Sequence, residues 1–150
     1  MRGYLSLSFF QQILQTMPDQ LLLVQAQHPA ENGGETVANA LYFKDENNLY
    51  GRYWGCLEEF DSLHFECCYY QGIEYCIEHD INHFDPGTQG EHKISRGFEP
   101  TICHSQHWIA HPQFSEAIKD FLKEEQLDIK EYAEQAAQHL PFNNNVTNIG

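Results

Sequence analysis

Alternation between hydrophobic and polar positions changes its period along the chain, and the first third is typical of a helix followed by strands. Residues 6–17 place apolar side chains at helical spacing and end before a proline. Residues 21–27 form an apolar run too short for a helix, so we expect a buried strand. Two further strands are expected at 36–44 and 49–57, separated by a tight polar turn. The pattern predicts a helix and then an antiparallel meander, within a sheet covered on two sides.

The remaining chain returns to helical spacing and is interrupted by proline and glycine. The expected elements are a helix over 61–79, a strand over 81–85, a short helix within 88–97, a strand over 101–110 and a long helix over 111–139. We expect one α+β (α/β) lobe over 1–140 with a mixed sheet and helices on both faces. Residues 141–150 are predicted to form a flexible tail.

Composition excludes several classes of protein. The 150 residues are 41% hydrophobic, enough for a core, and their net charge of −14 disfavours general binding to nucleic acid or anionic membranes. No apolar run approaches the roughly 20 residues that span a bilayer, and the first residues do not resemble a signal peptide. We therefore expect a soluble, cytoplasmic protein. The five cysteines, an odd number without a C-x-x-C pair, are predicted to be mainly reduced, buried thiols.

Glu66 is the first candidate for a functional residue. A helical wheel over residues 61–79 places it in the middle of the apolar face, between the directions of Ile73 and Ile77. A carboxylate there must be hydrogen-bonded or paired. Two interpretations follow: it satisfies free N–H groups in the first helical turn, or it points into a functional cleft.

Arg52 is the second candidate. In the expected strand it shares a face with Tyr50 and Trp54, where a buried guanidinium requires either a structural carboxylate partner or an incoming anion.

Residues 87–98 combine three glycines with two cations, an acid and a histidine. Between Asp45 and Ile118 the only basic residues are Arg52, Lys93 and Arg96. If the protein binds an anion or stabilises a developing negative charge, these three residues must supply most of the positive potential. The alternative is a solvated, glycine-rich turn.

Three histidines raise the question of a metal site. His104, His107 and His111 would share a face only in a helix, whereas the expected strand points the first two to opposite faces. No spacing matches a structural zinc site, so no metal is expected, and a histidine-rich metal-binding protein is the weaker alternative.

Three segments carry a resemblance to a known family. Residues 49–58 (LYGRYWGCLE), 64–73 (HFECCYYQGI) and 89–98 (QGEHKISRGF) resemble the FemAB-like predicted N-acyltransferases of the GNAT superfamily, often labelled peptidoglycan-biosynthesis related. Family members usually have two GNAT-like lobes, and the similarity here is to the C-terminal lobe only. The resemblance implies a GNAT-like mixed sheet and a transferase that acylates an amine.

The resemblance also implies roles for the candidate residues. Lys93 would stabilise the oxyanion or a donor phosphate, and Glu66, Glu91 or His92 would serve as base or orient the amine. The substrate-binding residues would be Arg52, Trp54, Gly90 and Arg96.

The partners implied by the resemblance remain alternatives. The donor is an acyl-CoA or an aminoacyl-tRNA, and the acceptor is an amine of a small molecule or a peptidoglycan precursor. We expect a homodimer that rebuilds the surface of the missing lobe. The alternative function is a non-catalytic lobe that self-associates or binds a protein partner.

Overall fold

The computed structural model describes residues 5–29, 34–87 and 90–141. It divides into two compact units, residues 1–88 and 89–150. The expected single lobe over 1–140 stays a prediction, and most of the expected tail, residues 142–150, lies outside the described residues.

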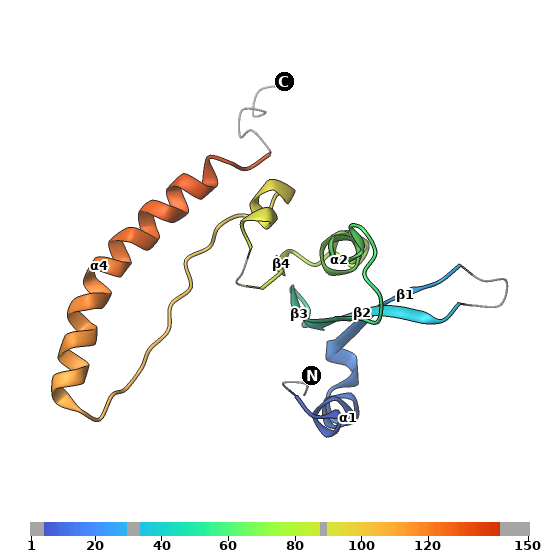
Figure 1. The fold of residues 1–150 in the computed structure, drawn as a ribbon, viewed down its shortest axis with the longest axis horizontal. Coiled ribbons are helices and arrows are strands. Elements are labelled where there is room, and N and C mark those ends of the chain that lie inside the picture. The colour runs from blue at the N-terminus through green and yellow to red at the C-terminus, as the bar shows by residue number, and fades with distance from the viewer. Residues whose placement is uncertain (1–4, 30–33, 88–89, 142–150) are drawn as a thin grey trace. The chain divides into compact units, whose positions relative to one another are not determined.

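The first unit contains most of the secondary structure (Figure 1). Its elements are α1 (Leu7–Thr16), η1 (Pro18–Gln20), β1 (Leu21–Gln27), β2 (Thr36–Lys44), β3 (Asn48–Cys56), α2 (Leu63–Phe65), η2 (Glu66–Tyr70), α3 (Gln71–Glu78) and β4 (His83–Asp85). The second unit contains η3 (Glu91–Arg96) and α4 (Pro112–Ala137).

The four strands form one mixed sheet in the order β1-β2-β3-β4. β1, β2 and β3 form an antiparallel meander, and β4 adds to β3 in parallel after the helical segment. The turn between β2 and β3 is held by Asp45, whose carboxylate accepts hydrogen bonds from the N–H groups of Asn47 and Asn48, both at 2.9 Å. The predicted mixed α/β fold, with its meander and long C-terminal helix, is confirmed.

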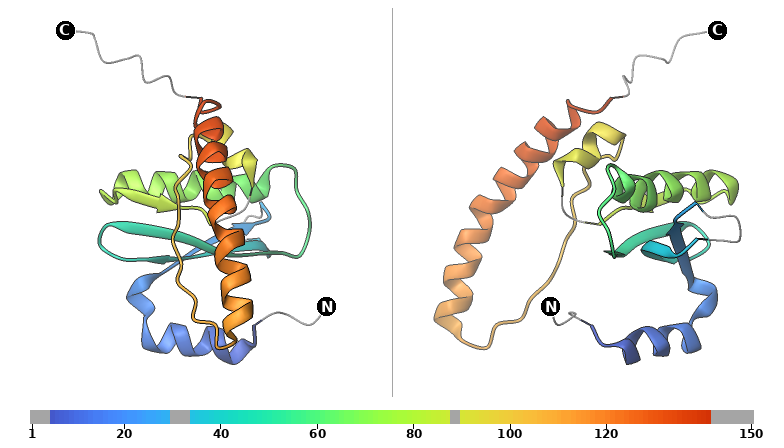
Figure 2. Two further views of the ribbon diagram at one scale, coloured as in Figure 1. Left: turned by 90° about the vertical axis from the view of Figure 1, so that its left-hand side faces the viewer. Right: turned by 45° about the vertical axis from the view of Figure 1, so that its right-hand side comes forward.

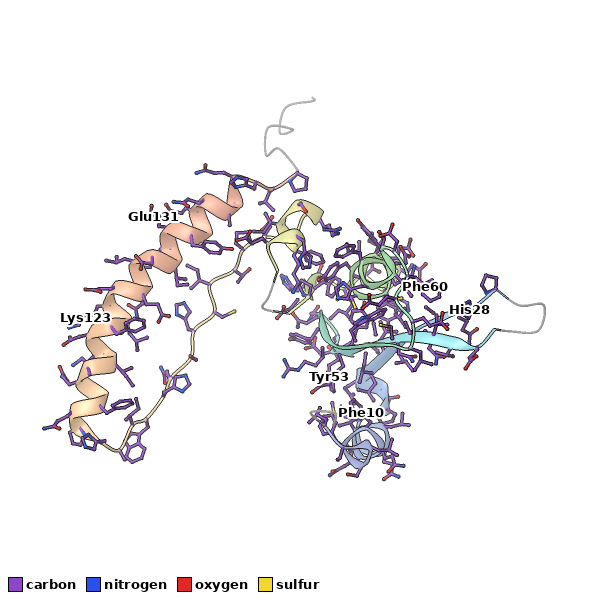
Figure 3. The ribbon with its side chains drawn as sticks, in the orientation of Figure 1. Phe10, His28, Tyr53, Phe60, Lys123 and Glu131 are labelled. Atoms are coloured by element: carbon purple, nitrogen blue, oxygen red, sulfur yellow. The ribbon has the colours of Figure 1, made fainter. Side chains whose placement is uncertain are left out.

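Helices lie on both faces of this sheet, α1 on one and α2–η2–α3 on the other, as Figure 2 shows. On one face Ala40, Tyr42 and Leu49 form the core with Cys67 and Cys76 of the helical segment. On the other face the rings of Phe9 and Phe10 from α1 pack edge-on against Tyr53 of β3, with centroid separations of 6.3 and 5.7 Å. Phe10 and Tyr53 point toward one another in Figure 3. These contacts on both faces explain why both central strands carry apolar residues at successive positions.

The second unit differs from expectation in one element. Residues 101–109 have no regular secondary structure and are almost entirely exposed, so the predicted strand over 101–110 is wrong. A strand needs a neighbour to accept its backbone hydrogen bonds, and no strand occurs among the described residues of this unit. The long helix is present as α4, within two residues of its predicted ends.

The apolar residues along α4 are largely exposed, including Phe114, Phe121 and Ile129. None of the helices in the described part of the chain is both long and apolar enough to cross a membrane.

The cysteines are divided between core and surface. All five are free thiols. Cys67 and Cys76 are buried as predicted, whereas Cys56 and Cys103 are exposed, so the expectation of burial was wrong for these two.

Candidate functional site

A β-bulge in β3 determines where Arg52 lies. Tyr53 pairs with Leu41 and Gly51 pairs with Tyr42, so Arg52 is an extra residue without a partner in the ladder. The extra residue reverses the alternation of side chains. Tyr50 and Trp54 therefore lie on opposite faces, and the predicted shared face of Tyr50, Arg52 and Trp54 is wrong.

The side chain of Arg52 is exposed, so it does not need the partner that a buried guanidinium would require. Its guanidinium carbon lies 5.7 Å from the centre of the Tyr53 ring, a cation–π contact. It forms no ion pair with a carboxylate of the described residues. The predicted structural salt bridge is therefore absent from the described part of the chain, whereas the anion-binding role stays a prediction.

The helical segment 63–78 contains a π turn, which changes the position of Glu66. The N–H group of Gln71 donates to the carbonyl of Glu66, five residues earlier, instead of four. A wheel at 100° per residue fails across such a turn, because a π turn contains more residues per rotation. Glu66 is exposed rather than buried, and Ile77, predicted to be buried, is 73% exposed.

The buried positions of the segment are Cys67, Tyr69, Gly72 and Cys76. Gly72 permits the helix to approach β4, because an added Cβ would lie 2.6 Å from Cζ of Phe84. The absence of a side chain at Gly72 therefore allows the helical segment to lie this close to the sheet.

Trp54 lies on the face of the sheet that the helical segment covers. Its ring packs edge-on against His64, with centroids 5.4 Å apart, and His64 contacts Tyr69 in the same geometry at 5.5 Å. Trp54 therefore helps to position the start of the helix that carries Glu66.

A cavity of about 430 Å³ adjoins Glu66 in the first unit. It lies where β1 ends, β2 begins and the helical segment starts, and its lining includes His28, Phe60, Glu66 and Tyr70. The sequence pattern indicated Glu66 but not the other three residues. The sequence contains only weak signals for two of them: His28 follows a predicted strand, and Phe60 is a single aromatic residue in an acidic loop.

The second unit gathers the remaining candidates in one short element, η3. Gly90 precedes it with a φ of 108°, and Gly97 ends it with a φ of 91°, conformations that favour glycine. An added Cβ at Gly90 would lie 2.3 Å from Cε1 of His92, so the imidazole ring packs directly on this glycine.

Lys93 is the buried charged residue of η3, with 9% of its surface exposed. The guanidinium of Arg96 donates to the backbone carbonyl of His92 at 2.7 Å. Tyr132 of α4 donates to the carboxylate of Glu91 at 3.5 Å. The short helix predicted within 88–97 is thus present as the 3₁₀ helix η3, in which Lys93 is buried and Arg96 is partly buried.

The predicted site residues therefore fall into two groups, one in each unit of the structure. Gly90, Glu91, His92, Lys93 and Arg96 share η3 in the second unit. Arg52, Trp54 and Glu66 belong to the first unit. A common cleft for Lys93 and Glu66 stays a prediction.

The histidines after η3 do not converge. His111 acts as the N-cap of α4, and its Nδ1 accepts a hydrogen bond from the N–H of Phe114 at 3.4 Å. Among the described residues no group of three His, Cys, Asp or Glu side chains is arranged to hold a metal ion.

Comparison with known protein families identifies a match that extends over most of the chain. The FemAB-like family, described as peptidoglycan biosynthesis/recognition, matches residues 1–144. No curated protein and no solved structure is significantly similar to the chain. The family match extends over both units and includes all three segments on which the resemblance rested. The chain therefore belongs to the FemAB-like family of peptidoglycan biosynthesis and recognition.

Proposed function

We propose that the chain is an N-acyltransferase of GNAT-like architecture that transfers an acyl or aminoacyl group to an amine. The observation that carries this proposal is the family match over residues 1–144. The mixed sheet, in which a helical segment connects β3 to the parallel strand β4, is compatible with it. Peptidoglycan metabolism, the subject of the family, offers amine acceptors in its precursors.

The reaction makes one bond and breaks one. The amine nitrogen attacks the acyl carbonyl carbon and a C–N bond forms, while the C–S bond of a thioester or the C–O bond of an aminoacyl ester breaks. A base removes the proton of the amine, and the departing thiol or hydroxyl gains a proton. The tetrahedral intermediate carries a negative oxygen, which requires a cation or N–H donors.

The candidate residues divide between these tasks. Lys93, with Arg96 in the same turn, would stabilise the oxyanion or a donor phosphate. Glu66, Glu91 or His92 would act as base or orient the amine. Arg52, Trp54 and Gly90 would bind substrate, and Arg52 is exposed at a bulge, where it is accessible to an acceptor carboxylate.

The donor is best identified by experiment. The chain is incubated with a peptide that bears one primary amine, together with either acetyl-CoA or an aminoacyl-tRNA, and the peptide mass is followed. We expect a mass increase equal to the acyl group with one donor class, and no increase with an acetylated peptide. No increase with either donor, from protein shown to be folded by circular dichroism, would overturn the proposal.

A second candidate function is supported by α4. Its apolar side chains, among them Phe121 (61% exposed) and Ile129, are exposed along much of its length. Large exposed apolar patches mark association sites. The alternative proposal is a non-catalytic lobe that forms a homodimer or binds a protein partner through this helix.

Light scattering at several concentrations tests self-association. The dimer proposal predicts a rise to twice the monomer mass, which Phe121→Lys abolishes and Lys123→Ala does not. Lys123 lies on the same helix in an exposed pair with Asp120 at 2.7 Å, so it is a matched control. A monomer at every concentration would contradict self-association.

A further inference from the structure

The cavity beside Glu66 has a lining that the proposed acyl transfer does not use in full. Its apolar part comes from three different elements: Ala26 of β1, Val37 of β2 and Leu63 of α2. Val37 sits at a second β-bulge, because Ala26 pairs with Ala38 and Gln27 pairs with Thr36. This extra residue places a 5% exposed apolar side chain in the wall of the cavity.

Aromatic side chains line the same cavity and remain accessible. Phe60 is 42% exposed and Tyr70 is 45% exposed. The ring of His28 packs edge-on against Phe60 with centroids 5.5 Å apart, and Figure 3 shows the two side chains near one another at the end of the sheet. The accessible ring surfaces offer contact area to an apolar or aromatic ligand body and can attract a cation.

The charges at the cavity are predominantly negative. Asp61 and Glu66 belong to its lining, and Glu58 lies 3.8 Å from Nε2 of His28. No lysine or arginine occurs between Arg52 and Lys93 in the sequence. An anionic ligand would therefore meet repulsion, whereas a cationic ligand would be attracted.

Glu66 is held in position with one oxygen available. Its Oε1 accepts a hydrogen bond from Nε2 of Gln71 at 2.9 Å, and the same amide nitrogen lies 3.1 Å from Oε2 of Glu74. Oε2 of Glu66 has no hydrogen-bond partner among the described residues. The amide thus orients the carboxylate at the cavity while leaving one oxygen to accept from a ligand.

We propose that this cavity binds an organic ammonium ion, with its apolar or aromatic body against Phe60, Tyr70 and Val37 and its ammonium group directed at Glu66. The volume of about 430 Å³ falls within the range of small-molecule sites. This inference adds a ligand class to Glu66, which the proposed acyl transfer uses as a base or to orient the amine, and it is tested separately because binding requires neither a donor nor the residues of η3.

Three probes of matched shape test the site by isothermal titration calorimetry at pH 7.5. Phenethylammonium carries the positive charge, 2-phenylethanol has the same body without charge, and phenylacetate carries the opposite charge. We expect the ammonium probe to bind at least tenfold more tightly than the alcohol, and the carboxylate probe to show no binding. Equal binding of ammonium and alcohol, or no binding of the ammonium probe, would overturn the proposal.

Two variants test which carboxylate binds the ammonium group. Glu66→Gln should weaken binding of phenethylammonium about tenfold, whereas Glu74→Gln should leave it unchanged. Glu74 is the matched control because it contacts the same amide of Gln71 but is not in the cavity lining. Equal effects of the two substitutions would remove Glu66 from the site. Since no acyl donor is present, failure of this experiment is distinct from failure of the transfer assay.

Discussion

The hydroxyl group of Tyr42 donates a hydrogen bond to the backbone carbonyl of Cys67, which ties the central strand β2 to the π turn of the helical segment. Tyr42 is 1% exposed and Cys67 is also buried. The bond therefore connects the middle of the sheet to the irregular turn that carries Glu66, without competition from water.

Replacing Tyr42 by phenylalanine should leave the Cys67 carbonyl buried without its side-chain donor. The free energy of unfolding should fall by about 1–3 kcal/mol, the cost of a buried group that loses its hydrogen bond. Urea denaturation followed by circular dichroism measures the change. A loss below about 0.3 kcal/mol would mean that the hydroxyl contributes little to stability.

The same hydroxyl should make stability sensitive to high pH. Burial, followed by the nearby thiol groups of Cys68 and Cys67, raises the pKa of Tyr42 well above its ordinary value near 10. Above pH 10 the unfolded chain loses this proton while the folded chain keeps it. The free energy of unfolding therefore decreases by up to about 1.4 kcal/mol per pH unit from this group.

Denaturation of Tyr42→Phe and of the original protein between pH 9 and pH 11.5 isolates this effect. Burial also raises the pKa values of Cys67 and Cys76, and both thiols remain in the variant. The difference in stability between the two proteins should therefore shrink as the pH rises above 10. A difference that is constant across this range would contradict a raised pKa for Tyr42.

Gly72 should tolerate a methyl group poorly. In Gly72→Ala the added Cβ would lie 2.6 Å from Cζ of Phe84 and 3.2 Å from Cε1 of Tyr42. Overpacking costs about 1–3 kcal/mol, more than the roughly 1 kcal/mol that alanine gains over glycine in a helix. We expect a net loss of about 1 kcal/mol in the free energy of unfolding.

The control for this prediction is Gly55→Ala in β3. No atom lies within 4 Å of an added Cβ at Gly55, so the substitution should be neutral or slightly stabilising. Thermal melts of both variants provide the comparison. An increase in melting temperature for Gly72→Ala would show that Phe84 moves aside at little cost.

The sequence was most informative where regular periodicity continues without interruption. β1 and β2 have their predicted bounds, β3 begins and ends one residue early, and α4 follows its apolar and polar pattern closely. Alternation cannot reveal an extra residue in a strand. The bulge at Arg52 therefore remained hidden, and with it the reversal that separates Tyr50 from Trp54.

Local sequence pattern gave wrong predictions at an irregular helical turn and at a segment that lacks a partner strand. The π turn shifts Glu66 out of the predicted buried face, and nothing in a 100° wheel anticipates such a turn. Residues 101–109 have strand-like composition, but composition does not provide a partner strand. For the candidate site, the sequence identified Glu66 and the residues of η3, whereas His28, Phe60 and Tyr70 meet at the cavity only through folding.

Acyl transfer that depends on Lys93 is tested most directly by the initial rate of acylated peptide formation, measured with whichever donor class supports transfer in the peptide assay. Lys93→Met removes the charge of the buried lysine while keeping an apolar stem, and Lys123→Ala removes an exposed lysine on α4.

We predict that Lys93→Met lowers the rate about 100-fold or more, as expected for loss of an oxyanion donor, while Lys123→Ala keeps the original rate. Equal rates for Lys93→Met and the original protein would contradict a catalytic role for Lys93.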